Sequence, residues 1–128
     1  MQFPAACPEI PVGDLVASIT YYSDRLGFTL DWSDANLGLA GISRGDSRLF
    51  LADAGYRSGL GNRGPTLLWI NLASRDAVDA LHAQWLGTGA RITSPPTAQP
   101  WQLYEFFAED IDGNILRIFY DFGWEERG

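Results

Sequence analysis

The chain has 128 residues, of which 46% are hydrophobic and 20% are charged, so it is long enough for one domain with a core and does not have the composition of a disordered protein. Its net charge of −7 repels phosphate backbones and argues against a nucleic-acid partner. No apolar run reaches the roughly 20 residues that a membrane helix needs, so we expect no membrane partner.

The N-terminal sequence and the cysteine usage point to a compartment. The segment MQFPAACPEIP has neither the basic start nor the long apolar stretch of a secretion signal. The single cysteine, Cys7, cannot form an internal disulfide, which fits a reducing environment. We therefore predict a cytoplasmic protein.

The first half of the chain predicts a strand, a helix and three more strands. Residues 8–12 form a short strand, and Asp14 is a typical N-cap. Apolar side chains then recur at helical spacing until Gly27, at positions Leu15, Ile19, Tyr22 and Leu26. Three short strands follow, at residues 28–33, 37–43 and 48–52, and the turn RGDS joins the last two as a hairpin.

Residues 55–66, GYRSGLGNRGPT, interrupt this pattern with four glycines and a proline, which predicts a flexible linker. The letters GLGNRG within it match a dinucleotide-binding fingerprint. That fingerprint functions only between a strand and a helix, whereas here Pro65 and a strand follow. We therefore predict no nucleotide site.

The second half repeats the order of the first. It predicts a strand at 67–72, a helix capped by Ser74 that ends at Gly87 and Gly89, a strand near 90–93, the loop TSPPTAQP, and strands at 102–108 and 114–120. Ile70 and Leu86 follow Ile10 and Leu26 at an offset of sixty. The fold class is therefore α+β, with two βαβββ modules forming a concave mixed sheet. We expect a single domain over residues 1–128, with module one at about 7–54, a linker at 55–66 and module two at about 67–121.

Catalytic motifs are weak in this sequence. The only histidine, His82, flanks the apolar face of the second helix and is predicted to be structural. Cys7 has no basic or helix-terminal neighbour that would lower its pKa. Asp110 and Asp112 belong to the turn EDIDGN, which hairpin chemistry explains.

The aromatic residues give the stronger signal. Trp85 is at helical spacing with Val78 and Leu81, which predicts a core position. Trp32 stands among polar neighbours, and Trp101 follows a polar, proline-rich loop. Two such indoles on a concave face could hold a flat ring between them by stacking or cation–π attraction. Packing or dimer contact is the alternative for either tryptophan.

Four segments together resemble the bleomycin resistance proteins of the vicinal oxygen chelate superfamily, which also contains glyoxalases and ring-cleaving dioxygenases. They are PEIPVGDLVASITYYSDRLGFTLDW, LFLADA, TLLWI and QPWQLYEFFAEDIDGN. The last segment is the one most specific to the drug-binding branch. The resemblance covers nearly the whole chain.

The resemblance implies a homodimer with two equivalent crevices where the subunits meet. Trp101 corresponds to the ring that stacks on the drug, and Trp32 to an opposing aromatic. The resemblance makes four more residues candidates for the crevice wall: Phe50, Trp69, Tyr104 and Phe106. The metal-ligand positions of the enzymes correspond to Cys7, Leu67 and Arg117. Because leucine cannot ligate and arginine stays protonated, we expect no metal and no cofactor.

These observations predict a non-catalytic resistance protein that sequesters a planar aromatic antibiotic, either bleomycin-like or a DNA-binding peptide. The acidic charge favours a neutral or cationic ligand. One alternative is a metal-dependent isomerase, transferase or dioxygenase of the same fold with an atypical site. Another is a protein-interaction module whose exposed aromatics form only a dimer interface.

Overall fold

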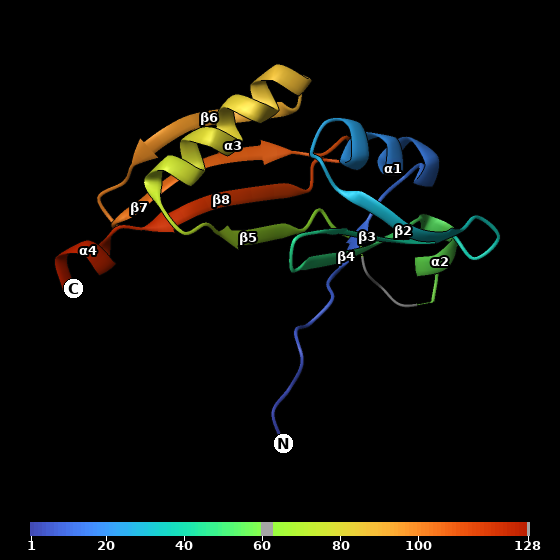
Figure 1. Cartoon of the computed structure of the whole chain (residues 1–128). Helices are drawn as coiled ribbons and strands as arrows, with labels where there is room; N and C mark the ends of the chain where they lie inside the picture. Colours follow the sequence, from blue (N-terminus) through green and yellow to red (C-terminus); the bar gives the residue numbers. More distant parts are fainter. Residues whose placement is uncertain (60–62, 128) are drawn as a thin grey trace. The chain divides into compact units, whose positions relative to one another are not determined.

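The computed structural model describes residues 1–59 and 63–127 and divides the chain into two compact units, Met1–Thr66 and Leu67–Gly128. Each unit is a four-stranded mixed sheet over its described residues, with a helix against one face (Figure 1). This arrangement confirms the α+β fold class and the repeated βαβββ order.

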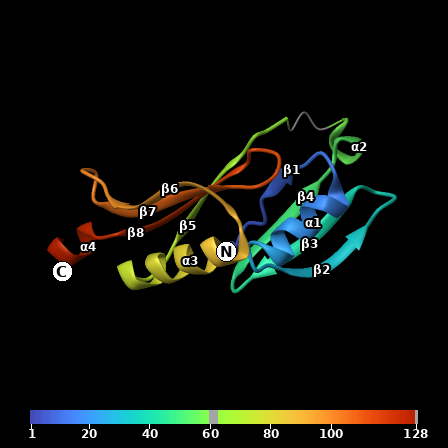
Figure 2. The same ribbon diagram turned by 90° about the horizontal axis from the view of Figure 1, so that it is seen from above.

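The first unit contains β1 (Glu9–Pro11), α1 (Leu15–Asp24), β2 (Thr29–Asp34), β3 (Leu39–Arg44), β4 (Ser47–Ala52) and the short α2 (Ala54–Arg57). Its strand order is β1-β4-β3-β2, in which β1 runs parallel to β4 and the other pairs are antiparallel. Helix α1 packs on β2, β3 and β4, as Figure 2 shows from above.

Helix α1 begins where the sequence predicts. The Asp14 carboxylate accepts a hydrogen bond from the Ala17 N–H at 3.0 Å, which satisfies one of the unpaired donors of the first turn. The predicted apolar face is buried at Leu15, Tyr22 and Leu26. These side chains meet the inner face of the sheet, whose buried members are Ile10, Ala40, Ile42, Leu49 and Leu51. The core of this unit therefore lies between α1 and the sheet.

The second unit contains β5 (Leu67–Asn71), α3 (Arg75–Thr88), β6 (Arg91–Ala98), β7 (Leu103–Glu109), β8 (Ile115–Asp121) and α4 (Gly123–Arg127). Its strand order is β5-β8-β7-β6, with β5 parallel to β8. Ser74 caps α3 through the Ala77 N–H, and Gly89 ends it with a φ of 79°, a left-handed conformation that favours glycine.

The core of the second unit lies between α3 and the sheet. Trp85 is fully buried there, as predicted, and its ring packs edge-on against Phe106. The His82 ring packs on the same phenylalanine at 5.2 Å, consistent with its predicted structural role. Val78, Ala108, Leu116 and Ile118 complete this layer.

The turn between β7 and β8 has the chemistry that its residues predict. Asp110 is buried, and its carboxylate accepts hydrogen bonds from the Asp112 and Asn114 N–H groups at 2.8 and 3.0 Å. Its other oxygen accepts from the Asn114 side chain at 2.8 Å. The two aspartates therefore belong to a hairpin turn.

Three elements differ from the sequence predictions. The loop predicted after residue 93 is largely strand, because β6 continues to Ala98 through Pro95 and Pro96. Prolines are tolerated there because β6 is an edge strand with register shifts on both sides of Ser94. The predicted linker begins with helix α2, and α4 was not predicted at all. The GLGNRG motif falls partly outside the described residues.

Across the described parts of the chain, no helix is long and apolar enough to cross a membrane.

Candidate ligand-binding surface

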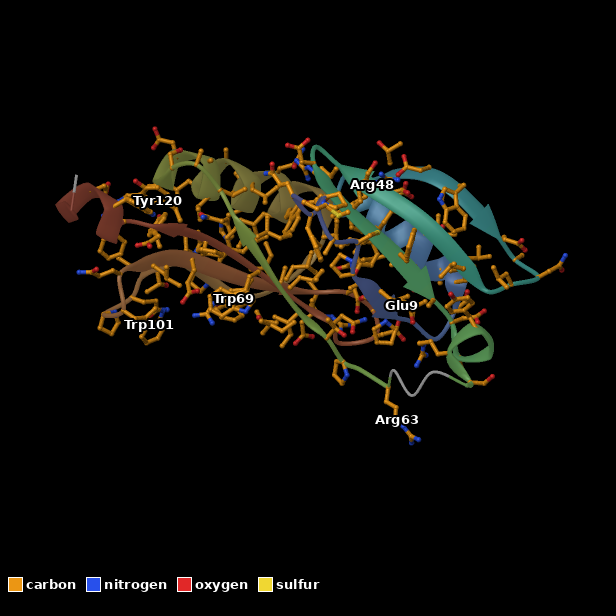
Figure 3. The ribbon with its side chains drawn as sticks, turned by 90° about the horizontal axis from the view of Figure 1, so that it is seen from below. Glu9, Arg48, Arg63, Trp69, Trp101 and Tyr120 are labelled. Carbon is orange, nitrogen blue, oxygen red and sulfur yellow. The ribbon has the colours of Figure 1, made fainter. Side chains whose placement is uncertain are left out.

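The second sheet has one face against α3, and no helix among the described residues of its unit covers the other face. Phe106, Leu116 and Ile118 point toward α3, so the alternate residues of β7 and β8 point the other way. We call this side the open face and define it by Trp69, Trp101, Glu105, Phe107, Arg117 and Phe119. In Figure 3 Tyr120 lies on the α3 side of the sheet, whereas Trp69 and Trp101 lie on the opposite side.

Arg117 is the centre of the open face. The strand register sets it beside Trp69 of β5 and Phe107 of β7. Its guanidinium lies 4.0 Å from the centre of the Trp69 ring and 5.1 Å from that of Phe107. Arginine stacks on aromatic faces in this way, and each such contact stabilises by about 0.5–2 kcal/mol.

The charge of Arg117 is balanced by Glu105. Two parallel hydrogen bonds join the pair, from Nε to Oε1 at 2.5 Å and from the terminal nitrogen to Oε2 at 3.0 Å. The Glu105 side chain is fully buried, whereas that of Arg117 is 17% exposed. A buried carboxylate needs such a partner, because unpaired it would cost several kcal/mol.

Trp101 extends the open face from the turn before β7. The turn closes through a hydrogen bond from the Gln102 N–H to the Gln99 carbonyl at 3.0 Å, with Gln102 at a φ of 69°. The indole is 57% exposed, and its Nε1–H donates to Glu105 Oε2 at 3.0 Å. One carboxylate therefore links the Trp101 ring to the arginine that stacks on Trp69.

Trp69 is the second exposed indole of the open face. It is 55% exposed, and Phe119 meets its ring edge-on at 5.5 Å. Its contacts with Arg117 and Phe119 fix the ring on the sheet. The open face therefore combines two half-exposed indoles with a neutralised ion pair.

Trp32 and Phe50 lie together in the first unit, on the side of its sheet away from α1. Their rings are 5.7 Å apart, and Trp32 is 41% exposed. A bulge between Leu30 and Trp32 disturbs the alternation of β2. The Trp32 ring covers Gly41, where an added Cβ would lie 2.5 Å from Nε1. The predicted pairing of Trp32 with Trp101 spans the two units and stays a prediction.

Two predicted wall residues face the helix instead of the open face. Phe106 is fully buried against Trp85 and His82, so it belongs to the core. Tyr104 is two residues earlier on the same side of β7, and its hydroxyl donates to Asp79 of α3 at 2.6 Å. That hydrogen bond, aided by partial burial, raises the pKa of Tyr104. Alternation along β7 explains both placements.

Four residues of the open face were not predicted to bind a ligand: Glu105, Phe107, Arg117 and Phe119. The resemblance singles out Arg117 only as a metal-ligand position. A signal for two of them was present, since a glutamate and an arginine interrupt the apolar strands LYEFFA and ILRIFY. Charged residues within an apolar strand indicate either that one face of the strand is exposed to solvent or that the residues form a buried ion pair.

The residues at the superfamily's metal positions do not fit a divalent cation. Leu67 has no donor atom, and Arg117 carries a positive charge held by Glu105. Burial raises the pKa of the Cys7 thiol, which disfavours the thiolate that binds metals. Arg48 lowers this pKa by a smaller amount, so the prediction that Cys7 has no basic neighbour was wrong. Within residues 1–59 and 63–125, no three His, Cys, Asp or Glu side chains form a group that could hold a metal ion.

Comparison with known proteins gives a family match and many similar structures. The model of the Glyoxalase/Bleomycin resistance protein/Dioxygenase superfamily matches residues 5–118. No curated protein matches the sequence.

Three solved structures illustrate the range of the relatives. A bleomycin-binding protein from bleomycin-producing Streptomyces verticillus, complexed with copper(II)-bleomycin, is 28% identical with a TM-score of 0.71 over 92% of this chain and 96% of that one. A glyoxalase/bleomycin resistance protein/dioxygenase from Nocardioides is 23% identical, with a TM-score of 0.76 over 94% and 85%. A lactoylglutathione lyase from Agrobacterium tumefaciens is 18% identical, with a TM-score of 0.76 over 94% and 96%.

The two sheets of the described residues, their strand orders and the family match over most of the sequence agree. The chain belongs to the Glyoxalase/Bleomycin resistance protein/Dioxygenase superfamily.

Proposed function

We propose that the protein binds a planar aromatic antibiotic, bleomycin-like or a DNA-binding peptide, and sequesters it without chemical change. The observation that carries this proposal is the open face of the second sheet, where Trp69 and Trp101 are both more than half exposed. Exposed indoles on a sheet face are costly in water unless something covers them, so they favour a ligand or a partner.

The physical basis of binding is stacking. A ring pair contributes about 0.5–1.5 kcal/mol beyond the burial of its surface. A ligand cation over an indole adds about 0.5–2 kcal/mol. The net charge of −7 raises the local concentration of a cationic drug and speeds its capture. None of these contributions needs a nucleophile, an acid or a metal.

The structural relative from Streptomyces verticillus supports this ligand class, because it is a bleomycin-binding protein and shares 28% identity over most of both chains. The same comparison includes a lyase, at 18% identity. The paired Arg117 and the leucine at position 67 favour binding over metal-dependent chemistry at the corresponding positions.

A homodimer is part of the proposal. In the first unit Leu30 and Trp32 of β2, with Leu37 in the next turn, are exposed apolar side chains. Such patches commonly mark protein contacts. Light scattering during gel filtration should give the mass of two chains, whereas the mass of one chain at micromolar concentration would remove the dimer from the proposal.

Calorimetric titration with bleomycin and with a quinoxaline-type peptide antibiotic tests the function. We expect saturable binding of at least one, without turnover, and a loss of about tenfold or more in Trp101→Ala, equivalent to about 1.4 kcal/mol. Trp124→Ala is the matched control, since Trp124 is exposed but lies on α4, outside the sheet.

Two outcomes contradict the proposal. One is the absence of binding to any aromatic antibiotic, together with unchanged drug protection in cells that carry Trp101→Ala. The other is a stoichiometric divalent metal that survives dialysis of the purified protein, which would favour the enzymatic alternative.

A further inference from the structure

We propose that Glu105 is a positioning residue whose buried carboxylate holds the Trp101 indole in its binding orientation before any ligand arrives. The proposal rests on the proposed function and deepens it. Glu105 would affect binding without contacting the drug. Its hydrogen bond to Trp101 would also limit which contacts the indole can make with a ligand.

The carboxylate of Glu105 receives three donors. Arg117 donates to both oxygens, at 2.5 Å to Oε1 and 3.0 Å to Oε2, and Trp101 Nε1–H donates to Oε2 at 3.0 Å. Glu105 is 1% exposed, so these bonds form away from water. Charge-assisted hydrogen bonds are about twice as strong as neutral ones, and low local dielectric strengthens them further.

Trp101 needs such an anchor because of where it lies. It belongs to the turn that precedes β7 and is not a member of any strand pair of the described sheet. A half-exposed indole in a turn would otherwise sample several rotamers. The bond to Glu105 selects one of them, and Arg117 in turn fixes Glu105 by its stacking on Trp69.

Ordering the ring in advance lowers the entropy cost of binding. An indole that is already fixed loses little freedom when a ligand stacks on it, so the same contact yields higher affinity. The entropy cost of ordering the Trp101 side chain is therefore met when the protein folds, and not when the ligand binds.

The same bond restricts the chemistry of recognition. The Nε1–H of Trp101 is already used by Glu105, so the indole offers a ligand its ring face and not a hydrogen-bond donor. The positive charge of Arg117 is neutralised by the same carboxylate. The ligand class that fits is a planar heteroaromatic ring recognised by stacking, with no anionic group required.

Nuclear magnetic resonance of protein labelled with 15N at its indoles tests the positioning role without any ligand. Trp101→Phe assigns the Trp101 Nε1–H signal. In the wild-type protein we expect a heteronuclear NOE at this nitrogen close to that of the ordered backbone, and slow exchange of its proton with solvent. A low NOE with rapid exchange would overturn the proposal, whatever the variants do.

Glu105→Gln provides the second arm. The amide cannot accept from Arg117 and Trp101 with both of its polar atoms, because one of them is itself a donor. We expect the Trp101 signal to shift, its NOE to fall and its proton exchange to accelerate severalfold. Glu109→Gln is the matched control, being the same change four residues along β7 at an ion pair with Arg91 at 3.6 Å. An unmoved Trp101 signal in folded Glu105→Gln overturns the proposal.

Titration with bleomycin separates this inference from the proposed function. If the wild-type protein binds bleomycin, we expect about tenfold weaker binding in Glu105→Gln and unchanged binding in Glu109→Gln. Equal affinities in all three proteins would overturn the positioning role while the proposed function stands. If bleomycin and the quinoxaline-type peptide both fail to bind, the proposed function fails, and the ligand-free measurements still decide the positioning role.

Thermal unfolding of Glu105→Gln shows whether that variant is folded. If it is not folded, the NOE and the proton exchange rate of Trp101 in the wild-type protein decide the positioning role.

Discussion

Gly41 shows how one missing side chain shapes the first unit. The Trp32 ring lies over it, so the Cβ of Gly41→Ala would lie 2.5 Å from Nε1 and 2.8 Å from Cε2 of the indole. Trp32 is half-exposed and can swing outward, so we expect a stability loss of only about 1 kcal/mol, the low end for overpacking. The larger effect is loss of the Trp32–Phe50 contact, measured as a red shift of tryptophan emission.

Gly87→Ala is the control for this change. It lies in α3, and no atom of the described residues beyond its own helix turn and chain neighbours lies within 4 Å of its added Cβ. We expect stabilisation by about 0.5–1 kcal/mol, the helix preference for alanine over glycine, with no change in emission. Unchanged emission in Gly41→Ala as well would contradict the placement of the indole.

Tyr104 carries a pH prediction. Its pKa is raised above the ordinary 10.0, first by the hydrogen bond to Asp79 and then by burial. Because the folded state binds this proton more tightly, the stabilisation is present below pH 10 and is lost as the pH rises through the raised pKa. Asp79→Asn should lower the pKa, measured by tyrosinate absorbance with Tyr104→Phe as the reference for assignment. Asp76→Asn, one helical turn earlier, should leave it unchanged.

The exposure of Trp32 and Trp101 could be predicted from single residues, because polar neighbours and an adjoining proline-rich loop are local signals. The partnership of Glu105 with Arg117 could not. It joins positions twelve apart through the register of β7 with β8, in which Arg117 is the neighbour of Phe107. The alternation of β7 points Phe106 toward α3. The role of each aromatic residue in β7 therefore depends on which face of the sheet it occupies, and the sequence alone did not give that face.

The turn between β7 and β8 shows what one residue contributes to an element. Asp110 is buried and accepts from two backbone N–H groups and the Asn114 side chain. Asp110→Ala would leave those donors unpaired, so we expect a loss of about 3 kcal/mol of unfolding free energy, measured by urea denaturation. Asp112→Ala changes an exposed side chain of the same turn and should cost about 0.5 kcal/mol or less. Equal losses in the two variants would contradict this assignment.

Helical periodicity and N-cap residues predicted the long helices well, whereas the extent of the edge strand β6 was predicted poorly. Asp14 and Ser74 cap α1 and α3 as expected, because an N-cap is a local interaction. Strand β6 extends to Ala98, beyond the predicted strand near 90–93, and includes Pro95 and Pro96. Whether a proline can remain in a strand depends on the absence of a neighbour on one side, which only the assembled sheet reveals.

The molecule as a whole was predictable because it is a repeat. The offset of sixty that relates Ile10 to Ile70 places both residues in the parallel strand of their sheets, β1 and β5. Once the order of helix and strands is recognised in one module, it predicts the same order in the other module. The two modules also differ, for example in the Arg117–Glu105 pair of the second sheet. The repeat does not predict such differences, and the candidate ligand-binding surface is built from them.

The overall charge of the protein should set how fast it captures a cationic ligand. A net charge of −7 creates a field that attracts cations over a Debye length, which is about 10 Å in 0.1 M salt and about 3 Å in 1 M salt. The association rate of a cationic antibiotic such as bleomycin should therefore fall severalfold between these two salt concentrations. The dissociation rate should change little, because stacking on Trp101 and Trp69 is insensitive to screening.

An uncharged quinoxaline-type peptide is the matched ligand for that measurement. Its association rate should stay nearly constant over the same range, because the field exerts no net force on it. Stopped-flow fluorescence of both ligands separates the two contributions, since steering alters association and stacking alters dissociation. If both ligands slowed equally, the salt effect would lie in the protein's own conformation, and the acidic charge would have no part in capture.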